Sequence, residues 1–144
     1  MIEIIPRRQF EQLNKQYLNY HLADAEKDYM LCIVMMLVSQ SVLHNKLIFK
    51  GGTAIHHCYL PGLRFSEDVD FTAVDRNISL EEVKAVLESE NLFEVKKEYV
   101  SGATIKIERL KYFGPLVQPN SLKFEIDFVQ DVLLKPNELI YNNI

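Results

Sequence analysis

Two segments that lie far apart in the sequence alternate between carboxylate-bearing residues and large apolar residues. The first runs from Glu67 to Val74 and the second from Leu122 to Val129. Successive side chains of a strand point to opposite faces of a sheet, so each segment is predicted to be a strand with one apolar and one polar face. Because aspartate is disfavoured in strands, its repeated occurrence here indicates that the polar face has a function.

The polar faces of these two strands are predicted to form a metal site. If the strands are neighbours, Asp68, Asp70 and Asp127 can converge. Three close carboxylates repel one another, and a divalent cation removes that conflict. Oxygen ligands with room left for water and phosphate suit Mg²⁺ or Mn²⁺. Glu125 shares the face of Asp127 and is the alternative ligand, and the remaining alternative is that all of these side chains are simply solvated.

A glycine-rich turn precedes the first of these strands. Gly51, Gly52 and Thr53 follow the apolar run 47–49, which is predicted to be a short strand, and a short helix is predicted to begin at Thr53. Glycines let the backbone approach a ligand closely, and a helix N-terminus offers N–H groups to a phosphate. The spacing is that of neither a P-loop nor a dinucleotide fingerprint. Taken alone, the turn is therefore weak evidence for a phosphate site, because such a turn is more often a plain strand-to-helix connection.

The rest of the chain is predicted to supply helices and further strands around these two motifs. The N-terminal helices are expected within about residues 8–44, and an α/β core that contains both motifs within about residues 46–134. Asp24 is the expected N-cap of the second helix, which is apolar almost all round and therefore predicted to be buried. The other expected elements share clear periodicity or capping signals: a first helix over Arg8–Leu22, an end of the second helix at Asn45–Lys46, a helix over Leu80–Glu90 capped by Ser79, strands over Phe93–Tyr99 and Thr104–Leu110, and a short helix from Pro136.

Composition restricts the protein class. A chain of 144 residues with 48% apolar and 25% charged residues is expected to form one domain. The net charge of −4 argues against a surface dedicated to coating nucleic acid. A local basic bias in the later strands is either a nucleic-acid contact or a solvated face, and its members are Lys96, Lys97, Lys106, Arg109, Lys111 and Lys123.

The cysteines and the N-terminus indicate a cytoplasmic protein. Cys32 and Cys58 lie in apolar surroundings without disulfide or zinc spacing, so a reducing compartment is expected. The N-terminus lacks the pattern of a signal peptide, and the longest apolar run, Tyr29 to Val38, is too short to span a bilayer. His56 and His57 are adjacent on the predicted helix and point about 100° apart, so they do not readily share a metal ion.

Taken together, the motifs resemble a known family. The segments Lys50-Gly-Gly-Thr-Ala-Ile and Arg64-Phe-Ser-Glu-Asp-Val-Asp-Phe are similar to those of the AbiEii/MenT-like toxin nucleotidyltransferases, a branch of the DNA-polymerase-β-like nucleotidyltransferase superfamily. The segments 25–29 and 122–128 also resemble that family. The resemblance implies an α/β (α+β) nucleotidyltransferase core with a mixed sheet backed by helices.

The resemblance also implies roles for individual residues. By their positions in the motifs, Asp68 and Asp70 bind the metal, and Asp127 is the third carboxylate, which deprotonates the acceptor hydroxyl. Gly52 and Thr53, with Gly51, hold the phosphates of the nucleotide. Two further residues belong to the expected nucleotide site: Arg64, for which contact with phosphate and pairing with Glu67 are both open, and Ser66, near the metal.

The family resemblance implies transfer of a nucleoside monophosphate from a nucleoside triphosphate to an acceptor hydroxyl, which in some members belongs to tRNA, and neutralisation by an antitoxin. Family members continue past the third carboxylate into a helical part with a lysine and an Arg-x-Arg-Asp-like segment, whereas this sequence ends soon after Lys135-Pro136. We therefore expect that part to be largely absent, which could expose apolar surface and favour a homodimer. The alternatives are a catalytically incomplete remnant that binds nucleotide or a partner protein without turnover, and a transferase acting on a small molecule.

Overall fold

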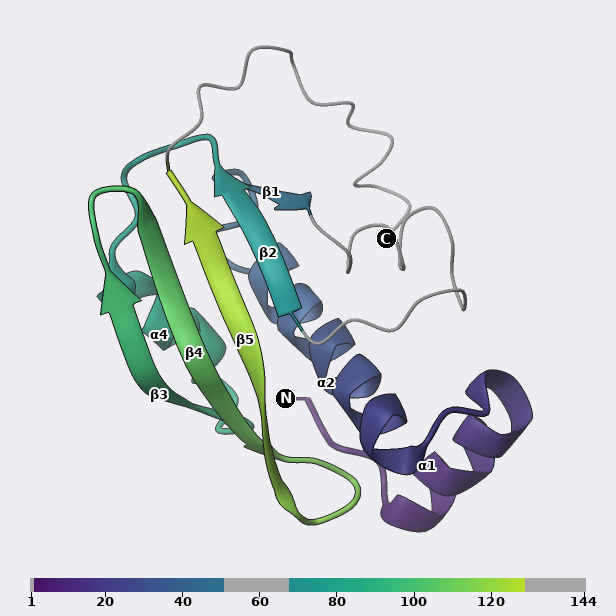
Figure 1. Ribbon diagram of the computed structural model, residues 1–144. Coiled ribbons are helices and arrows are strands. Elements are labelled where there is room, and N and C mark those ends of the chain that lie inside the picture. Colours follow the sequence, from purple (N-terminus) through teal and green to yellow (C-terminus); the bar gives the residue numbers. More distant parts are fainter. Residues whose placement is uncertain (1, 51–67, 129–144) are drawn as a thin grey trace.

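The computed structural model describes residues 2–50 and 68–128 and contains a five-stranded mixed sheet (Figure 1). The strand order is β1-β2-β5-β4-β3; β2 and β5 are parallel, and every other neighbouring pair is antiparallel. Helices α2 and α4 lie on the same face of the sheet (Figure 1). The predicted mixed sheet backed by helices is therefore confirmed. The strands are β1 (Leu47–Lys50), β2 (Asp68–Ala73), β3 (Phe93–Val100), β4 (Thr104–Phe113) and β5 (Pro119–Asp127).

The predicted alternation of β2 and β5 is present in the fold. In β2, Val69, Phe71 and Ala73 are buried, while the residues between them are half-buried. In β5, Phe124 and Ile126 are buried in the same way. The apolar side chains of both strands therefore belong to one core, and their carboxylates lie on the opposite face of the sheet.

The core lies between the sheet and the two backing helices. The rings of Phe71 and Phe124 join the two central strands, with their centroids 5.5 Å apart. Met30, Leu31 and Val34 of α2 are fully buried in the same cluster. Val83 and Leu87 of α4 are buried there as well.

The N-terminal region differs from the single helix expected over Arg8–Leu22. Helix α1 covers Arg7–Leu13 and continues as a π-helix over Asn14–Leu18. The helix ends there because Asn19 adopts a left-handed conformation, with φ of 56°. The buried Asn14 side chain fixes the following turn by donating to the Tyr20 carbonyl at 2.8 Å and accepting from the Tyr20 N–H at 3.1 Å.

This turn also changes the start of the second helix. Helix α2 covers Leu22–Ser39 with His21 at the N-cap, so the prediction that Asp24 caps it was wrong, and Asp24 lies in the first turn. The helix ends at Ser39 rather than at Asn45–Lys46, because the Ser41 side chain accepts from the Leu43 N–H at 3.0 Å in a turn that replaces helical bonding. Cys32 is exposed rather than enclosed by apolar residues. Cys58 and the predicted helices at 53–59 and after Pro136 lie outside the described residues.

The later elements agree with the sequence apart from their ends. Helix α4 covers Leu80–Leu87, and the Ser79 side chain accepts from the Glu82 N–H at 3.1 Å, which confirms the predicted cap. Strand β4 extends to Phe113 and β5 begins at Pro119, so both are longer than expected. Among the helices of the described ranges, none combines the length and apolar character required to cross a bilayer.

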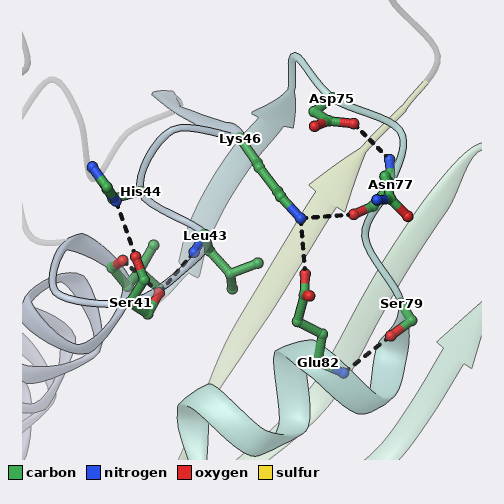
Figure 2. A network of polar contacts seen from close by, with 9 residues as sticks. Ser41, Leu43, His44, Lys46, Asp75, Asn77, Ser79 and Glu82 are labelled. Atoms are coloured by element: carbon green, nitrogen blue, oxygen red, sulfur yellow. Dashed lines mark hydrogen bonds and ion pairs between the residues drawn. The ribbon is translucent and has the colours of Figure 1, made fainter.

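A polar network fixes the end of β2 against the start of β1 (Figure 2). The Lys46 ammonium donates to the Asn77 carbonyl at 3.0 Å and lies 3.5 Å from the Glu82 carboxylate. The Asp75 carboxylate accepts from the Asn77 N–H at 2.8 Å and closes the turn after β2. Because Lys46 directly precedes β1 and Glu82 belongs to α4, these contacts hold the β1–β2 edge of the sheet against its backing layer.

A buried glutamate joins α2 to the β4–β5 loop. Glu26 is only 1% exposed, and its carboxylate accepts from the Leu116 N–H at 2.8 Å. Gly114 leaves room for this side chain, since a Cβ placed there would lie 2.7 Å from Glu26 Oε2. Burial raises the pKa of the Glu26 carboxyl above its ordinary value of 4.5, although the Leu116 hydrogen bond and the charge of Arg7 oppose the rise.

We expect Gly114→Ala to lower the free energy of unfolding by about 1–3 kcal/mol, because the added methyl group overpacks the buried Glu26 site. Urea unfolding monitored by circular dichroism measures this change. The control is Gly102→Ala, which meets no atom within 4 Å, and it should change the free energy by less than about 0.5 kcal/mol. Equal effects of the two substitutions would contradict this account of Gly114.

We expect Glu26→Gln to flatten the pH dependence of stability, because glutamine still accepts the Leu116 hydrogen bond but does not ionise. The raised pKa means that the folded protein binds this proton more tightly than the unfolded chain. The wild-type free energy of unfolding therefore falls as pH rises through the raised pKa. The advantage of the variant over the wild type should grow as pH rises above 4.5, the ordinary pKa of this carboxyl, as measured by urea unfolding. The exposed Glu3→Gln serves as the control and should follow the wild type.

Candidate functional site

The predicted site residues lie on the face of the sheet that carries no backing helix. Helices α2 and α4 cover the opposite face, and within residues 2–50 and 68–128 no helix lies over this one (Figure 1). Asp68 and Asp70 of β2 and Glu125 and Asp127 of β5 are all half-buried there. We refer to this side of the sheet as the open face.

Parallel pairing of β2 with β5 brings these carboxylates onto neighbouring strands. In the register of this pair, Asp68 is opposite Lys123, Asp70 is opposite Glu125, and Asp127 is opposite Thr72. Asp70 therefore has Glu125 as its direct neighbour and Asp127 as its diagonal neighbour, two residues further along β5. The two strands are adjacent, which is the condition that convergence of these carboxylates requires, although the 45 residues 74–118 separate them in the chain.

The chemistry of this set fits a hard cation, although the carboxylates are spread along the two strands. Asp68 and Asp70 are two residues apart, which spaces their Cα atoms by about 6.6 Å. No group of three His, Cys, Asp or Glu side chains in the described parts of the chain is close enough to hold a metal ion. Convergence of Asp68, Asp70 and Asp127 on one cation therefore stays a prediction.

Like charge is concentrated where β2 meets β5. Asp70 and Glu125 are direct cross-strand neighbours, and like charges in that position destabilise a sheet by up to about 1 kcal/mol. Lys123 opposite Asp68 and Lys106 opposite Glu125 bring positive charge to the borders of the acidic group. The arrangement is one that a bound divalent cation would stabilise.

The remaining predicted site residues lie outside the described part of the chain: Gly51, Gly52, Thr53, Arg64 and Ser66, together with His56, His57 and Glu67. The strand that leads into the glycine turn is described, however. Lys50, its last residue, is the register partner of Asp70. The chain thus leaves β1 beside the strand that carries Asp68 and Asp70.

Sequence reasoning did not assign the basic residues of β4 to the same face as the carboxylates. Lys106 is opposite Glu125 because Ile105 and Ile107 on either side of it are buried in the core. The alternation of apolar residues around Lys106 was a usable signal. The sequence contains no signal for which strand lies beside β4, because that neighbour is known only from the β4–β5 pairing.

Comparison with known proteins identifies the family. Residues 34–143 match the family described as nucleotidyl transferase AbiEii toxin of the type IV TA (toxin–antitoxin) system. The chain belongs to the AbiEii nucleotidyltransferase toxin family. This match covers more than half of the chain, including β2 and β5 with their aspartates, and it confirms the resemblance noted in the sequence.

Two solved structures from Helicobacter pylori share the fold of this AbiEii family member. One is a protein assigned to the nucleotidyltransferases, with 18% identity, a TM-score of 0.57 and coverage of 77% of this chain and 48% of that one. The other is JHP933, with 19% identity, a TM-score of 0.56 and coverage of 81% and 47%. The chain thus spans about half the length of either structure. No curated protein matches the sequence.

We expect Mg²⁺ to raise the unfolding temperature of the wild type and to have a smaller effect on Asp70→Asn. Differential scanning fluorimetry with and without Mg²⁺ measures both effects. The control, Asp24→Asn, removes one negative charge from α2 and should respond to Mg²⁺ as the wild type does. An equal response of Asp70→Asn would contradict a metal role for this residue.

Proposed function

We propose that this AbiEii family member is a metal-dependent nucleotidyltransferase that transfers a nucleoside monophosphate from a nucleoside triphosphate to an acceptor hydroxyl. The observation that carries the proposal is the parallel pairing of β2 with β5, which supports a shared role for Asp68, Asp70 and Asp127. The donor chemistry of these carboxylates suits Mg²⁺ or Mn²⁺. Bound Mg²⁺ would neutralise charge on the α-phosphoryl group and the departing pyrophosphate.

The chain's own residues would supply orientation and proton transfer. Asp68 and Asp70 hold the metal, and the backbone of Gly51, Gly52 and Thr53 binds the phosphates. Asp127 accepts the proton of the acceptor hydroxyl as its oxygen forms a bond to the α-phosphorus. The bond between that phosphorus and the pyrophosphate oxygen breaks at the same centre, and pyrophosphate leaves. In this proposal Arg64 contacts the phosphates and Ser66 lies beside the metal.

The biological role that we propose is that of the toxin component of a cytoplasmic toxin–antitoxin or abortive-infection system. Its partners would be a cognate antitoxin protein and an acceptor RNA such as tRNA, and the chain would form a homodimer. Membership of the AbiEii toxin family supports this proposal. The second candidate is a protein that binds nucleotide or a partner without turnover, and it is favoured by the finding that no three His, Cys, Asp or Glu side chains of the described residues are close enough to hold a metal ion.

We expect Asp70→Ala to lower nucleotide transfer by at least about 100-fold, as expected when a metal-dependent displacement loses a metal ligand. Labelled nucleoside triphosphates and bulk tRNA provide the assay, and calorimetry with a non-hydrolysable triphosphate measures binding separately. Asp127→Asn should reduce transfer more than Glu125→Gln if Asp127 is the base. The exposed Lys15→Ala is the control and should leave transfer unchanged.

Equal labelling by wild type and Asp70→Ala would reject the proposed mechanism. Triphosphate binding without any product would favour the second candidate.

A further inference from the structure

The open face of the sheet is divided into an acidic half and a basic half. The acidic half is the β2–β5 pair described above. The basic half consists of the open-face residues of β4 and β3, and it contains five cations and two carboxylates. Register places Lys96, Lys106, Arg109, Lys111 and Glu94 on this face, and the ion pair of Lys97 and Glu108, which have no register partners, lies between them along β3 and β4.

Three of these five cations already have partners. Lys96 lies 2.7 Å from the Glu94 carboxylate, and Lys97 lies 3.4 Å from Glu108. The Lys111 ammonium lies 5.3 Å from the centre of the Phe113 ring. Lys106 and Arg109 form no hydrogen bond or ion pair with any residue of the described ranges. They provide positive charge in the middle of the sheet that no ion pair within the described ranges neutralises, although Lys106 is the register partner of Glu125.

Exposed aromatic side chains accompany these cations. Tyr99 of β3 is 54% exposed and is the direct cross-strand partner of Lys106, so the two side chains share the open face. Phe113 at the end of β4 is 55% exposed. A cationic surface with exposed aromatic rings is the combination that binds single-stranded nucleic acid, since phosphates contact the cations and bases stack on the rings.

Register connects the basic half directly to the candidate catalytic site. Tyr99, Lys106, Glu125 and Asp70 are successive register partners across β3, β4, β5 and β2. Three strand spacings separate the first from the last, which corresponds to about 14 Å. A strand of nucleic acid bound over Tyr99 and Lys106 would therefore end close to the carboxylates.

From this juxtaposition we infer that the basic half of the open face binds a single-stranded segment of the acceptor nucleic acid. Lys106 and Arg109 contact its phosphates, and Tyr99 stacks on one of its bases. The inference rests on the proposed function, because it assigns the acceptor of that reaction and its approach to the site. A double-stranded acceptor is disfavoured because stacking on Tyr99 requires an unpaired base.

The test is fluorescence anisotropy with a labelled oligoribonucleotide of about 12 nucleotides, a length within the site sizes of single-strand binders. It is performed in EDTA so that the acidic site contributes no metal-dependent binding. We expect Lys106→Ala/Arg109→Ala to weaken binding at least about 10-fold and to reduce the slope of log affinity against log salt by about 1.4, for two lost phosphate contacts. Tyr99→Ala should weaken binding about 5-fold or more, and Tyr99→Phe should retain it.

The matched control is Arg8→Ala/Lys15→Ala, which removes the same charge from exposed positions of the N-terminal helices. It should bind as the wild type does. Unfolding midpoints of all variants establish that they fold. Lack of wild-type binding, equal binding by both double variants, or preference for a duplex would overturn the inference. Equal competition by polyglutamate would also overturn it, because the surface would then fit an acidic protein segment as well as a nucleic acid.

Failure of this inference is distinguishable from failure of the proposed function. Asp70→Asn should bind the oligoribonucleotide as the wild type does, because Asp70 is not in the basic half. Loss of transfer with retained binding would reject only the mechanism. Transfer that proceeds without dependence on Lys106, Arg109 and Tyr99 would reject only the acceptor surface.

Discussion

The parallel pairing of β2 with β5 is the constraint on which the rest of the structure depends. It joins two segments that are distant in the sequence and places Phe71 against Phe124 in the core. The same register places Asp70 beside Glu125 on the open face. A shift of one residue would send every one of these side chains to the wrong face. Burial of the apolar faces therefore fixes the carboxylate positions, although the carboxylates themselves repel one another.

The layer behind the sheet compensates for that repulsion. Fully burying a phenylalanine or leucine stabilises the fold by about 1.5–3 kcal/mol, whereas a like-charge neighbour costs less than about 1 kcal/mol. Helices α2 and α4 supply this burial, and two polar contacts fix the layer to the sheet. Lys46 contacts both the turn after β2 and the Glu82 carboxylate of α4. Glu26 of α2 accepts a hydrogen bond from the β4–β5 loop. Unfavourable charge on one face is thus tolerated because the other face is well packed.

The elements that could be predicted from the sequence are those determined by local patterns. The alternation in β2 and β5 predicted their two faces, and Ser79 predicted the start of α4. The break near Asn19 could not be predicted, because it depends on the buried Asn14 side chain and overrides a continuous helical spacing. Glu26 was also missed as a structural residue, since its partner belongs to a loop 90 residues away in the sequence. For the candidate site, the sequence predicted the shared face of the carboxylates, but their neighbours across β4 required the three-dimensional pairing.

Net charge is a poor guide to what this open face can bind, because a sheet sorts charges by strand and by side. The chain carries a formal net charge of −4, which argues against a surface that coats nucleic acid. Pairing nevertheless collects carboxylates on β2 and β5 and cations on β4 and β3 of the same face. Such separation is useful to a transferase that must bind a metal ion and a polyanion side by side. The cations would attract the phosphates, while the carboxylates would repel them unless a cation were bound. Binding of the nucleic acid over β4 and β3 would then be independent of the metal, and only the approach of its acceptor hydroxyl to Asp70 would require a bound cation.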